Sequence, residues 1–350
     1  MTLLQRMTQK EIGLILHFLQ DKMDISMKTS VTPITKIKDK FKLRNWKENN
    51  SNLSKRGSLT LWIDASVLED WSKIDPTKKE VGQRIYLDSI ILCCLLLKIN
   101  FRLKYRQSTG FISSLLLLMG KGKYVVVDYT TLCRRQSLLL VEVSQRLEQG
   151  EKLDIAIDST GLKVCGEGEW KVRRHGVFKR RTWCKLHIGI DVDSRQIIWI
   201  SLTGNDTDDA AEAVNMLEGR AVRINSFRGD GAYNDFYFRK ALGNGIVQII
   251  LPPKDAVTQK GARKKPAENY LGQRNQAIGY INEHGREAWK IQTGYHRRNL
   301  NEVVMFRYKT TFGGELNARK IENQSSEVKI KYLILNKYAL LGLPDSYKVA

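Results

Sequence analysis

The chain has 350 residues, of which 42% are hydrophobic, and 58 basic against 37 acidic residues give it a formal net charge of +21. That composition excludes a disordered protein, and the charge favours a polyanionic partner, for which DNA, RNA and an anionic membrane surface are the candidates. Because no apolar run reaches the about 20 residues that span a bilayer, nucleic acid is the leading partner and no membrane association is expected.

Residues 1–79 are interpreted as an N-terminal extension followed by a basic arm. Apolar residues recur at helical spacing in Glu11–Met23, whereas Lys28–Ser58 is basic, shows little periodicity and is predicted to be loosely ordered. A second methionine, Met27, leaves open whether residues 1–26 belong to the native product. The N-terminus shows no charged-then-apolar secretion signal and the number of cysteines is odd, which together favour reduced thiols and a cytoplasmic location.

Residues 80–150 are predicted to form a helical DNA-binding domain of three helices. Ile85–Lys98 and Tyr105–Met119 are apolar enough to be buried, and the third helix is expected from about Tyr129 to Arg146, after a glycine-containing turn. A short polar helix after a turn is what a helix-turn-helix presents to the major groove of DNA. An ordinary three-helix bundle with a basic surface is the alternative.

The start of the third helix carries the residues that would contact DNA in a helix-turn-helix. Asp128 is placed to cap this helix, because an Asp side chain can accept a hydrogen bond from a backbone N–H of the first turn. Arg134 and Arg135 follow within the first two turns and are predicted to bind DNA.

The period of the hydrophobic pattern changes to two at Leu153, and residues 151–347 are predicted to form an α/β domain. Three strands in a meander and two strands that follow helices give a mixed five-stranded sheet with flanking helices. The expected strands are Leu153–Ser159, Trp183–Asp193, Gln196–Thr203, Arg223–Gly229 and Val247–Leu251, and the expected helices between them are Asp208–Gly219 and Asp235–Leu242. Residues 254–290 are basic and are predicted to be a short insertion, before a partly helical tail.

Two aspartates lie at the ends of predicted strands. Asp158 ends the first strand and Asp230 ends the fourth. Because sites in open α/β sheets form at the carboxyl ends of strands, both carboxylates are predicted to lie in a functional site. Either aspartate alone is more often the cap of a turn or a helix. Asp191 and Asp193 adjoin the Ser194–Arg195 connection and are interpreted as turn residues.

A third carboxylate belongs to a stretch of four polar groups, Tyr295, Arg298, Glu302 and Lys309. On a helix, their offsets of 0, 3, 7 and 14 place them on one arc of about 60°. Such an arc suits a metal-bound phosphate, with Glu302 holding the cation and the other groups holding phosphate oxygens. A solvated helix face is the alternative, and the β-branched and aromatic residues of Val303–Tyr308 would also suit a strand.

Asp158, Asp230 and Glu302 together offer oxygen ligands for two Mg²⁺ ions, which Mn²⁺ could replace. Two such ions can activate a water or a 3′-hydroxyl and stabilise the leaving oxygen of an in-line displacement. The cysteines show neither C-x-x-C spacing nor a paired-histidine pattern, so zinc is not expected.

Between the first two predicted strands, Lys171–Lys185 contains seven basic residues and no acidic one. The tract is predicted to clamp the DNA backbone, because phosphate contacts supply affinity without sequence readout. A solvated charged hairpin is the alternative. The seven residues are Lys171, Arg173, Arg174, Lys179, Arg180, Arg181 and Lys185.

A set of short motifs occurs in a fixed order along residues 38–347. They are KRGSLTLW (Lys55–Trp62), DYTTLCRR (Asp128–Arg135), IDSTGLK (Ile157–Lys163), GEGEWKVRRHG (Gly166–Gly176), KLHIGID (Lys185–Asp191), GDGAYN (Gly229–Asn234), the Y-x2-R-x3-E-x6-K spacing from Tyr295 to Lys309, and LGLPDS (Leu341–Ser346). Each motif alone is weak, but the ordered set resembles bacterial insertion-sequence transposases of the DDE class. The resemblance is strongest to the insertion-sequence-five family and its IS-four-like relatives.

This resemblance implies an RNase H-like catalytic fold. The metal ligands that it implies are Asp158, Asp230 and Glu302. It also implies that Tyr295, Arg298 and Lys309 position the cleaved DNA end and its phosphate. All three implied ligands are present in the sequence, so the resemblance favours a catalytically competent protein.

The function that the resemblance implies is that of a DNA transposase. Such a protein binds terminal inverted repeats, assembles as a homo-oligomer on double-stranded DNA, cleaves the ends and transfers the 3′-hydroxyl ends to target DNA, here in the bacterial nucleoid. A catalytically silent or domesticated DNA-binding protein derived from a transposase is the alternative. A simple nuclease on the same fold is a further one, against which the separate helical region and the Tyr295–Lys309 signature count.

Overall fold

The computed structural model describes residues 40–75, 85–141, 151–164, 183–218, 223–258 and 269–349. They fall into a large compact unit, Lys47–Leu343, and a small unit formed by the two ends of the chain. In the small unit, β1 (Lys40–Leu43) pairs antiparallel with β8 (Ser346–Val349). In these described ranges, no helix combines the length and the apolar character that crossing a membrane requires.

The N-terminal region contains more regular structure than the sequence indicates. The predicted helix Glu11–Met23 lies outside the described residues. The prediction of a loosely ordered Lys28–Ser58 is wrong for its second half, which contains β1 and the helix α2 (Trp46–Lys55). Hydrophobic periodicity does not indicate α2, because the residues that this helix buries are Asn49 and Asn52.

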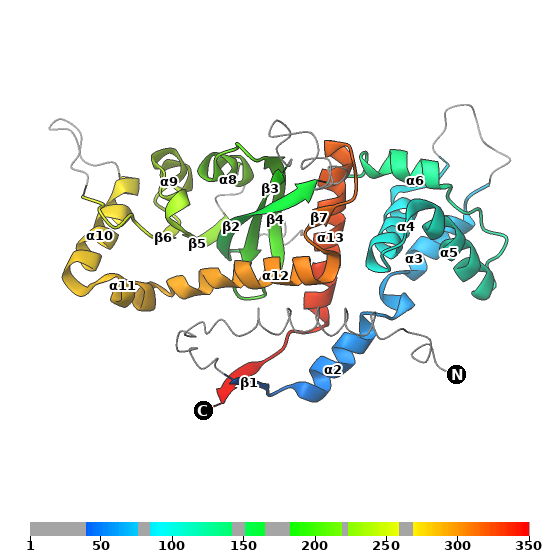
Figure 1. The fold of residues 1–350 in the computed structure, drawn as a ribbon, viewed down its shortest axis with the longest axis horizontal. Helices are drawn as coiled ribbons and strands as arrows, with labels where there is room; N and C mark the ends of the chain where they lie inside the picture. Colours follow the sequence, from blue (N-terminus) through cyan, green and yellow to red (C-terminus); the bar gives the residue numbers. More distant parts are fainter. Residues whose placement is uncertain are drawn as a thin grey trace, which may run out of the picture. The chain divides into compact units, whose positions relative to one another are not determined.

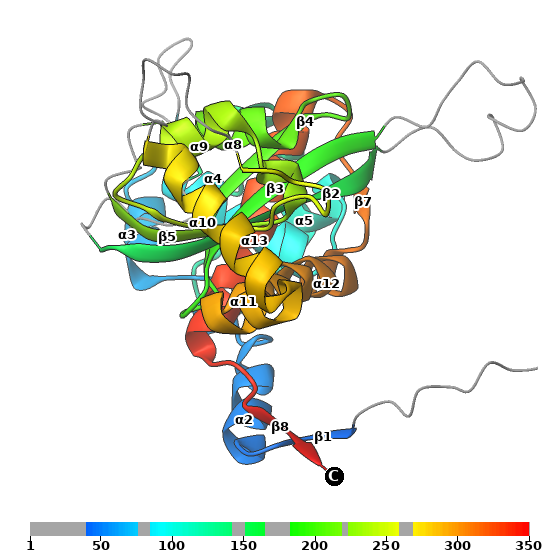
Figure 2. The same cartoon turned by 90° about the vertical axis from the view of Figure 1, so that its left-hand side faces the viewer.

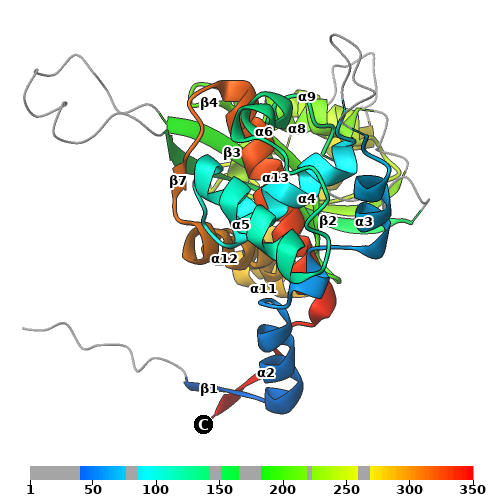
Figure 3. The same ribbon diagram turned by 90° about the vertical axis from the view of Figure 1, so that its right-hand side faces the viewer.

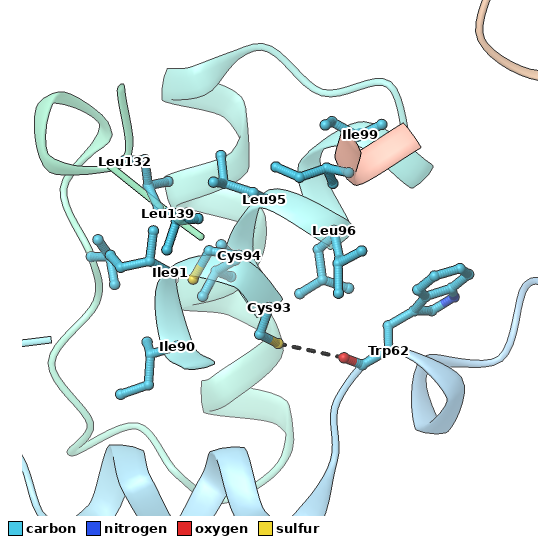
Figure 4. Close-up of a cluster of buried hydrophobic side chains, with 14 of the residues drawn as sticks. Trp62, Ile90, Ile91, Cys93, Cys94, Leu95, Leu96, Ile99, Leu132 and Leu139 are labelled. Atoms are coloured by element: carbon cyan, nitrogen blue, oxygen red, sulfur yellow. Dashed lines mark hydrogen bonds between the residues drawn. The ribbon is translucent and has the colours of Figure 1, made fainter. Parts of the chain in front are cut away.

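The helical part of the large unit surrounds one apolar helix. After the short 3₁₀ helix η3 (Leu59–Leu61), its helices are α3 (Ala65–Ser72), α4 (Asp88–Asn100), α5 (Tyr105–Leu118) and α6 (Tyr129–Gln136). α4 lies at the centre of the core, where the thiol of Cys93 donates a hydrogen bond to the carbonyl oxygen of Trp62 at 3.5 Å (Figure 4). The sequence of α4 is apolar on nearly every side of the helix, which suits a helix that other helices bury on most of its surface.

The helix α13 (Ile321–Leu341) completes this core from the far end of the sequence. Its residues Ile330 and Ile334 are fully buried among the side chains of α4, α5 and α6. Figure 3 shows those three helices gathered beside α13. The helical part and the sheet therefore share one helix.

The third predicted helix, α6, begins where the sequence indicates. The side chain of Asp128 caps it by accepting a hydrogen bond from the N–H of Thr130 at 2.8 Å. The helix ends at Gln136 rather than near Arg146, because the chain turns there and buries Leu139 in the core. The connection from α5 spans residues 119–128, which is longer than the three or four residues of a typical helix-turn-helix turn.

The described residues form a mixed sheet with the strand order β4-β3-β2-β5-β6, and the two-residue strand β7 pairs with β2. β2, β3 and β4 form an antiparallel meander. β5 and β7 each pair in parallel with β2, and β6 pairs in parallel with β5. The α/β class with a mixed sheet is thus confirmed, and β7 is a strand that the sequence did not predict. The bounds are β2 Leu153–Val164, β3 Trp183–Asp191, β4 Ile197–Gly204, β5 Ile224–Gly229, β6 Val247–Ile250 and β7 Glu315–Leu316.

Helices cover both faces of the sheet (Figure 1). α8 (Asp209–Leu217) and α9 (Phe236–Leu242) pack on one face together with Ile155 and Ile157 of β2. α12 (Leu300–Phe312) and α13 pack on the other face together with Ala156 of β2. Because side chains alternate along a strand, Asp158 shares the α12 face with Ala156.

The predicted insertion is helical from Asn269 on, after a turn and irregular chain at residues 254–258. Residues 259–268 lie outside the description, and α10 (Asn269–His284) and α11 (Arg286–Thr293) follow them. Ala277 of α10 and Trp289 of α11 form a small core with Ile249 of β6. Figure 2 shows both helices in front of the sheet, so this segment extends the sheet's covering layer rather than forming a simple loop.

Candidate active site

Two neighbouring strands bring Asp158 and Asp230 together. β2 and β5 are parallel with Ala156 opposite Arg228, so the same register continued by two residues places Asp158 opposite Asp230. Asp158 does not end its strand, because β2 continues to Val164 against β3. It lies instead where the pairing of β2 with β5 stops, which opens one edge of β2 at this position.

The turn after β5 fixes the backbone around Asp230. One carboxylate oxygen of Asp230 accepts a hydrogen bond from the N–H of Ala232 at 2.9 Å, which caps the 3₁₀ helix η6 (Gly231–Tyr233). Gly229 is required just before it, since a Cβ at that position would lie 2.9 Å from the ring of Tyr233. Asp230 is therefore a turn cap and a strand-end carboxylate at the same time.

The four-residue signature does not lie on a single α-helix. Tyr295 and Arg298 belong to a 3₁₀ helix, η7 (Tyr295–Asn299), whereas Glu302 and Lys309 belong to α12. The prediction of one arc on one helix is wrong, because Gly294 takes a left-handed conformation (φ 63°) that ends α11 and redirects the chain into η7. The helical α12 also excludes a strand at residues 303–308.

Arg298 joins two of the three predicted metal ligands. Its Nη1 donates to Oδ2 of Asp158 at 2.9 Å, and its Nη2 donates to Oε1 of Glu302 at 3.1 Å. The side chains of Arg298 and Asp158 are 15% and 17% exposed, whereas that of Glu302 is 59% exposed. Water therefore screens the Asp158 pair far less than the Glu302 pair, which lies at the open side of the site.

The charges of this cluster act on one another. Burial raises the pKa of Asp158, and Asp230 and Glu302 add to that rise, while Arg298 and the N–H of Ser159 oppose it. Burial alone would lower the pKa of Arg298, but the surrounding carboxylates, Asp158 first among them, raise it. The three carboxylates thus lie near enough to repel one another, and Arg298 is the cation that offsets this repulsion.

Lys309 reaches the same edge of β2. Its Nζ donates to Oγ1 of Thr160 at 3.0 Å. Thr160 lies two residues after Asp158, so the alternation of the strand puts both side chains on the α12 face. Thr160 is a site residue that the sequence analysis missed, although its i,i+2 spacing from Asp158 on a predicted strand was the signal for it.

Tyr295 packs in the protein core next to the site and is not exposed in it. It is 7% exposed, and its ring centroid lies 5.8 Å from that of Trp289 in the small core against β6. The guanidinium carbon of Arg298 lies 6.0 Å from the Tyr295 ring. Burial raises the pKa of Tyr295. Tyr295 therefore packs against the guanidinium of Arg298 from the side of the small core.

The donor set suits a hard divalent cation, because its three carboxylates offer only oxygen. Across the described ranges, no three Asp, Glu, His or Cys side chains converge closely enough to hold a metal ion as they stand. Arg298 accounts for this, since its guanidinium takes the place of a cation between Asp158 and Glu302. Its Nε is buried and finds no acceptor among the described residues, so the present arrangement leaves this guanidinium partly unsatisfied.

The predicted DNA clamp falls mostly outside the described residues. Lys171, Arg173, Arg174, Lys179, Arg180 and Arg181 lie in the segment 165–182. Lys185 is on β3, where its Nζ donates to the carbonyl oxygen of Thr207 at 2.7 Å and lies 3.5 Å from Oδ1 of Asp209. Lys185 therefore has partners within the protein, and its expected role in a clamp receives no support from the structure.

The two arginines of α6 differ in their surroundings. Arg135 is 8% exposed, and its guanidinium donates to the carbonyl oxygen of Tyr86 at 3.0 Å and pairs with Asp88. Arg134 is exposed and hydrogen-bonds to Thr130 of its own helix at 3.1 and 3.3 Å. Arg135 is thus held inside the protein, whereas Arg134 remains accessible to a DNA phosphate or base.

The hairpin between β3 and β4 confirms the interpretation of its two aspartates. Asp191 accepts a hydrogen bond from the N–H of Ser194 at 3.0 Å, as a turn residue does. Asp193 is exposed and pairs with Arg297. The neighbouring arginines Arg297 and Arg298 therefore each hold an aspartate, one outside the site and one within it.

Comparison with known families and structures identifies the class of protein. A family model described as a transposase DDE domain matches residues 149–337, and a second model with the same description matches residues 54–167. The chain thus falls in the class of the DDE transposases, whose members generally use divalent metal ions. The first match alone covers more than half of the sequence, and the chain belongs to this family.

Two solved structures show a weaker similarity. A synaptic complex of piggyBac transposase with hairpin DNA shares 12% identity at a TM-score of 0.29, with 82% of this chain and 81% of that one covered. A pre-cleavage Mos1 transpososome shares 12% identity at a TM-score of 0.19, with 96% and 97% covered. Neither similarity is close enough to transfer the role of a residue.

Proposed function

We propose that this transposase cleaves the ends of an insertion element and joins their 3′-hydroxyl groups to target DNA. The observation that carries the proposal is the grouping of Asp158, Asp230 and Glu302 around Arg298, with Lys309 bonded to Thr160 nearby, so that three carboxylates face two cations among the described residues. Structural ion pairs usually match one acid with one base, whereas this cluster holds an excess of negative charge at the edge of a sheet. Such an excess is what binding of divalent cations requires.

The three carboxylates would hold the metal ions, Mg²⁺ or Mn²⁺, between β2, β5 and the first turn of α12. When bound, these ions supply an activated water or 3′-hydroxyl and stabilise the leaving oxygen. On metal binding, Arg298 would release its two carboxylates and turn its planar fork of donors to a phosphate oxygen. Lys309 offers a second cation to the same phosphate from the next turns of α12.

The sheet supports an RNase H-like fold for residues 151–347. An antiparallel meander, β2 to β4, lies beside two strands, β5 and β6, that run parallel to the central β2. The two aspartates lie on the central strand and on its parallel neighbour, where crevices between strands and helices form in α/β sheets. The third carboxylate comes from a helix that packs on that sheet.

We assign recognition of the terminal inverted repeats to the helical region within residues 80–150. The exposed guanidinium of Arg134 is the side chain of α6 best placed to reach DNA. The basic arm within residues 1–79 and the tract Lys171–Lys185 would add backbone contacts, and the net charge of +21 favours them. Cleavage at two ends calls for a homo-oligomer on DNA, in the nucleoid of a bacterial cell.

The test replaces each proposed metal ligand and measures cleavage and binding separately. Asp158→Ala, Asp230→Ala and Glu302→Ala are each expected to lower cleavage of element-end DNA in Mg²⁺ by at least about a thousandfold, because each removes a carboxylate from the metal ions. Binding of the same DNA in an electrophoretic shift without metal is expected to stay within about tenfold, since phosphate contacts by Lys and Arg dominate affinity.

Asp193→Ala is the matched control, because Asp193 also pairs with an arginine of η7 but lies outside the site. It is expected to cleave like the parent protein. Cleavage that survives Glu302→Ala would remove α12 from the metal site. Binding without cleavage by the parent protein, in Mg²⁺ and in Mn²⁺, would instead identify a catalytically silent DNA-binding protein.

A further inference from the structure

A pocket of about 500 Å³ lies where the α4–α5 connection meets the end of α12 and the middle of α13. Its lining includes four cations, Lys98, Arg102, Lys104 and Lys309, and the rings of Tyr105 and Phe312. Within the described residues, none of these cations forms an ion pair with a carboxylate. Lys98 lies over the ring of Tyr105 at 4.3 Å and Arg102 donates to the carbonyl oxygen of Thr311, but neither contact cancels a charge, so this concave site suits an anion of high charge density.

The carboxylate in the pocket lining does not neutralise these cations. Glu327 is buried and pairs with the buried Lys331 at 2.7 Å, so the charges of those two residues offset each other. Burial lowers the pKa of Lys98, and the charges of Lys331 and Lys104 lower it further, although Glu327 opposes them. Burial is thus the main cause that disfavours the charged form of Lys98, and a bound anion would offset it.

The backbone at Arg102 gives independent support. Arg102 follows α4 in a left-handed conformation (φ 53°), a region that favours glycine and that costs an arginine conformational energy. The N–H of Leu103 donates to the carbonyl oxygen of Lys98, and the N–H of Arg102 donates to that of Ile99, which is the usual glycine-containing end of a helix. An arginine in this position places a guanidinium at the pocket where glycine would fit the backbone better.

The helix termini around the pocket act in opposite directions. The N-terminus of α5, a helix of 14 residues, begins at Tyr105 and attracts an anion through its unpaired N–H groups. The C-terminus of α4 repels one, but its last carbonyl groups already accept hydrogen bonds from Arg102 and Leu103. The full charges of the four side chains therefore determine the field in the pocket.

The pocket adjoins the candidate active site through Lys309. This residue lines the pocket, and its Nζ donates to Thr160, two residues from Asp158. We infer that the pocket binds a phosphate group of the DNA strand that leaves the catalytic carboxylates, so that the α4–α5 connection forms a second phosphate site. That the phosphate belongs to DNA rests on the proposed function. What the cations of the pocket would recognise is the phosphate group itself.

The test compares two arginine-to-glycine variants of the full-length protein. Arg102 and Arg195 are the non-glycine residues with positive φ among the described residues, at 53° and 57°. Arg102→Gly and Arg195→Gly remove the same charge and relieve the same kind of backbone conformation, and Arg102→Gly also removes the hydrogen bond from Arg102 Nη2 to the carbonyl oxygen of Thr311. Both variants are expected to stay folded at the assay temperature, which thermal melting of each variant checks. Arg195 lies in the β3–β4 hairpin and does not line the pocket, which makes it the matched control.

The measurement is fluorescence anisotropy of a labelled ten-nucleotide oligothymidylate at several salt concentrations, without metal. Arg102→Gly is expected to weaken binding about fivefold and to reduce the slope of log affinity against log salt by about 0.7, the loss of one phosphate contact on a single strand. Arg195→Gly is expected to leave both values unchanged. Equal effects of the two variants, or no effect of Arg102→Gly, would overturn the inference.

A competition arm separates a DNA phosphate from a free one. If the pocket serves a DNA strand, inorganic pyrophosphate displaces the oligonucleotide no better than sulfate at equal ionic strength. Displacement by submillimolar pyrophosphate, lost in Arg102→Gly, would show that the pocket prefers a free phosphate compound to a DNA phosphate and would overturn the choice of the DNA strand as its ligand. The binding assay needs no cleavage, so a parent protein that fails to cleave element ends would remove the proposed function while the Arg102–Arg195 comparison still decides the pocket.

Discussion

Arg298 donates hydrogen bonds to both Asp158 and Glu302. If these carboxylates hold a divalent cation, as proposed above, Arg298 competes with the metal ion while it also offers a donor to phosphate. These two roles separate in a variant. A residue that repels the metal and attracts the substrate affects metal affinity and cleavage in opposite directions.

Arg298→Gln is therefore expected to bind Mn²⁺ about tenfold more tightly, since a like charge about 4 Å away costs the ion at least about 1 kcal/mol. The same change is expected to lower cleavage by at least about a hundredfold, because the phosphate loses a fixed charged donor. Isothermal titration with Mn²⁺ in the absence of DNA measures the first effect. Arg297→Gln is the control, since its arginine holds Asp193 outside the site. Unchanged or weaker Mn²⁺ binding by Arg298→Gln would contradict the competition.

At the scale of elements, the sequence predicted the sheet more completely than the helices. The alternating pattern of apolar residues predicted β2, β3 and β4. Successive side chains of a strand point to opposite faces of the sheet, and helices cover both faces. The same pattern is absent from α2, which buries asparagines, and the two-residue β7 is too short to show any period. Both elements contact segments that are far away in sequence: β7 pairs with β2, and Asn52 of α2 lies against Gly342.

The candidate site was predictable as a set of residue types but not as a geometry. Predicted strand ends and the signature spacing led to Asp158, Asp230 and Glu302 as candidates, although Asp158 lies inside β2 and not at its end. The break between η7 and α12 was not predictable from spacing, because it depends on the left-handed Gly294 and on the packing of Tyr295 against α11. The burial of Arg135 was hidden for a similar reason, since its partners are Tyr86, just before α4, and Asp88, the first residue of α4, more than 40 residues earlier in the sequence.

Glu327 fixes α13 to the segment that contains β7. Its carboxylate accepts hydrogen bonds from the N–H groups of Asn317 at 3.0 Å and Ala318 at 2.9 Å, and it pairs with Lys331. Burial alone would raise the pKa of Glu327, but Lys331 and these N–H groups outweigh it and hold the pKa below its usual value. A carboxyl group whose pKa is lower in the folded than in the unfolded state stabilises the fold above the usual carboxyl range, and this stabilisation is lost as the pH falls through the folded pKa.

Glu327→Gln is expected to cost about 3–5 kcal/mol of unfolding free energy at pH 7, because it leaves the buried Lys331 without a counter-charge. The difference from the parent is expected to shrink as the pH falls from the usual carboxyl range through the lowered pKa of folded Glu327, where the parent carboxyl becomes protonated as well. Urea unfolding at pH 7 and at a series of pH values below about 4 measures both effects. Glu322→Gln, on the exposed first turn of the same helix, is expected to change neither. A pH-independent difference would contradict the assigned role of the Glu327 charge.

At the scale of the molecule, α13 connects the helical part with the sheet. Ile330 and Ile334 lie in the helical core, while Val328, Tyr332 and Leu335 of the same helix lie in the core against the sheet. Residues Lys47–Leu343 accordingly form one compact unit. We expect this unit to unfold cooperatively, although DNA recognition and catalysis are assigned to different parts of it.

Ile334→Ala tests this cooperativity. Removal of a fully buried isoleucine side chain is expected to cost about 2–5 kcal/mol. Because α13 serves both cores, hydrogen exchange at the amide groups of α4 and of β3 is expected to accelerate by the same factor. Ile321→Ala, at a position of α13 that is 49% exposed, is the control and should leave both unchanged. Acceleration confined to α4 would show that the two parts unfold separately.

The shared helix also has a consequence for biosynthesis. A ribosome delivers α4, α5 and α6 long before it delivers Ile330 and Ile334, so the nascent helical part carries an unfilled apolar surface while the sheet is still being translated. That surface is a binding site for chaperones during synthesis and a source of aggregation if synthesis stalls. A polypeptide that stops before α13 therefore lacks an intact helical part as well as an intact sheet part, so the two functions proposed for these parts would both depend on the last long helix to be made.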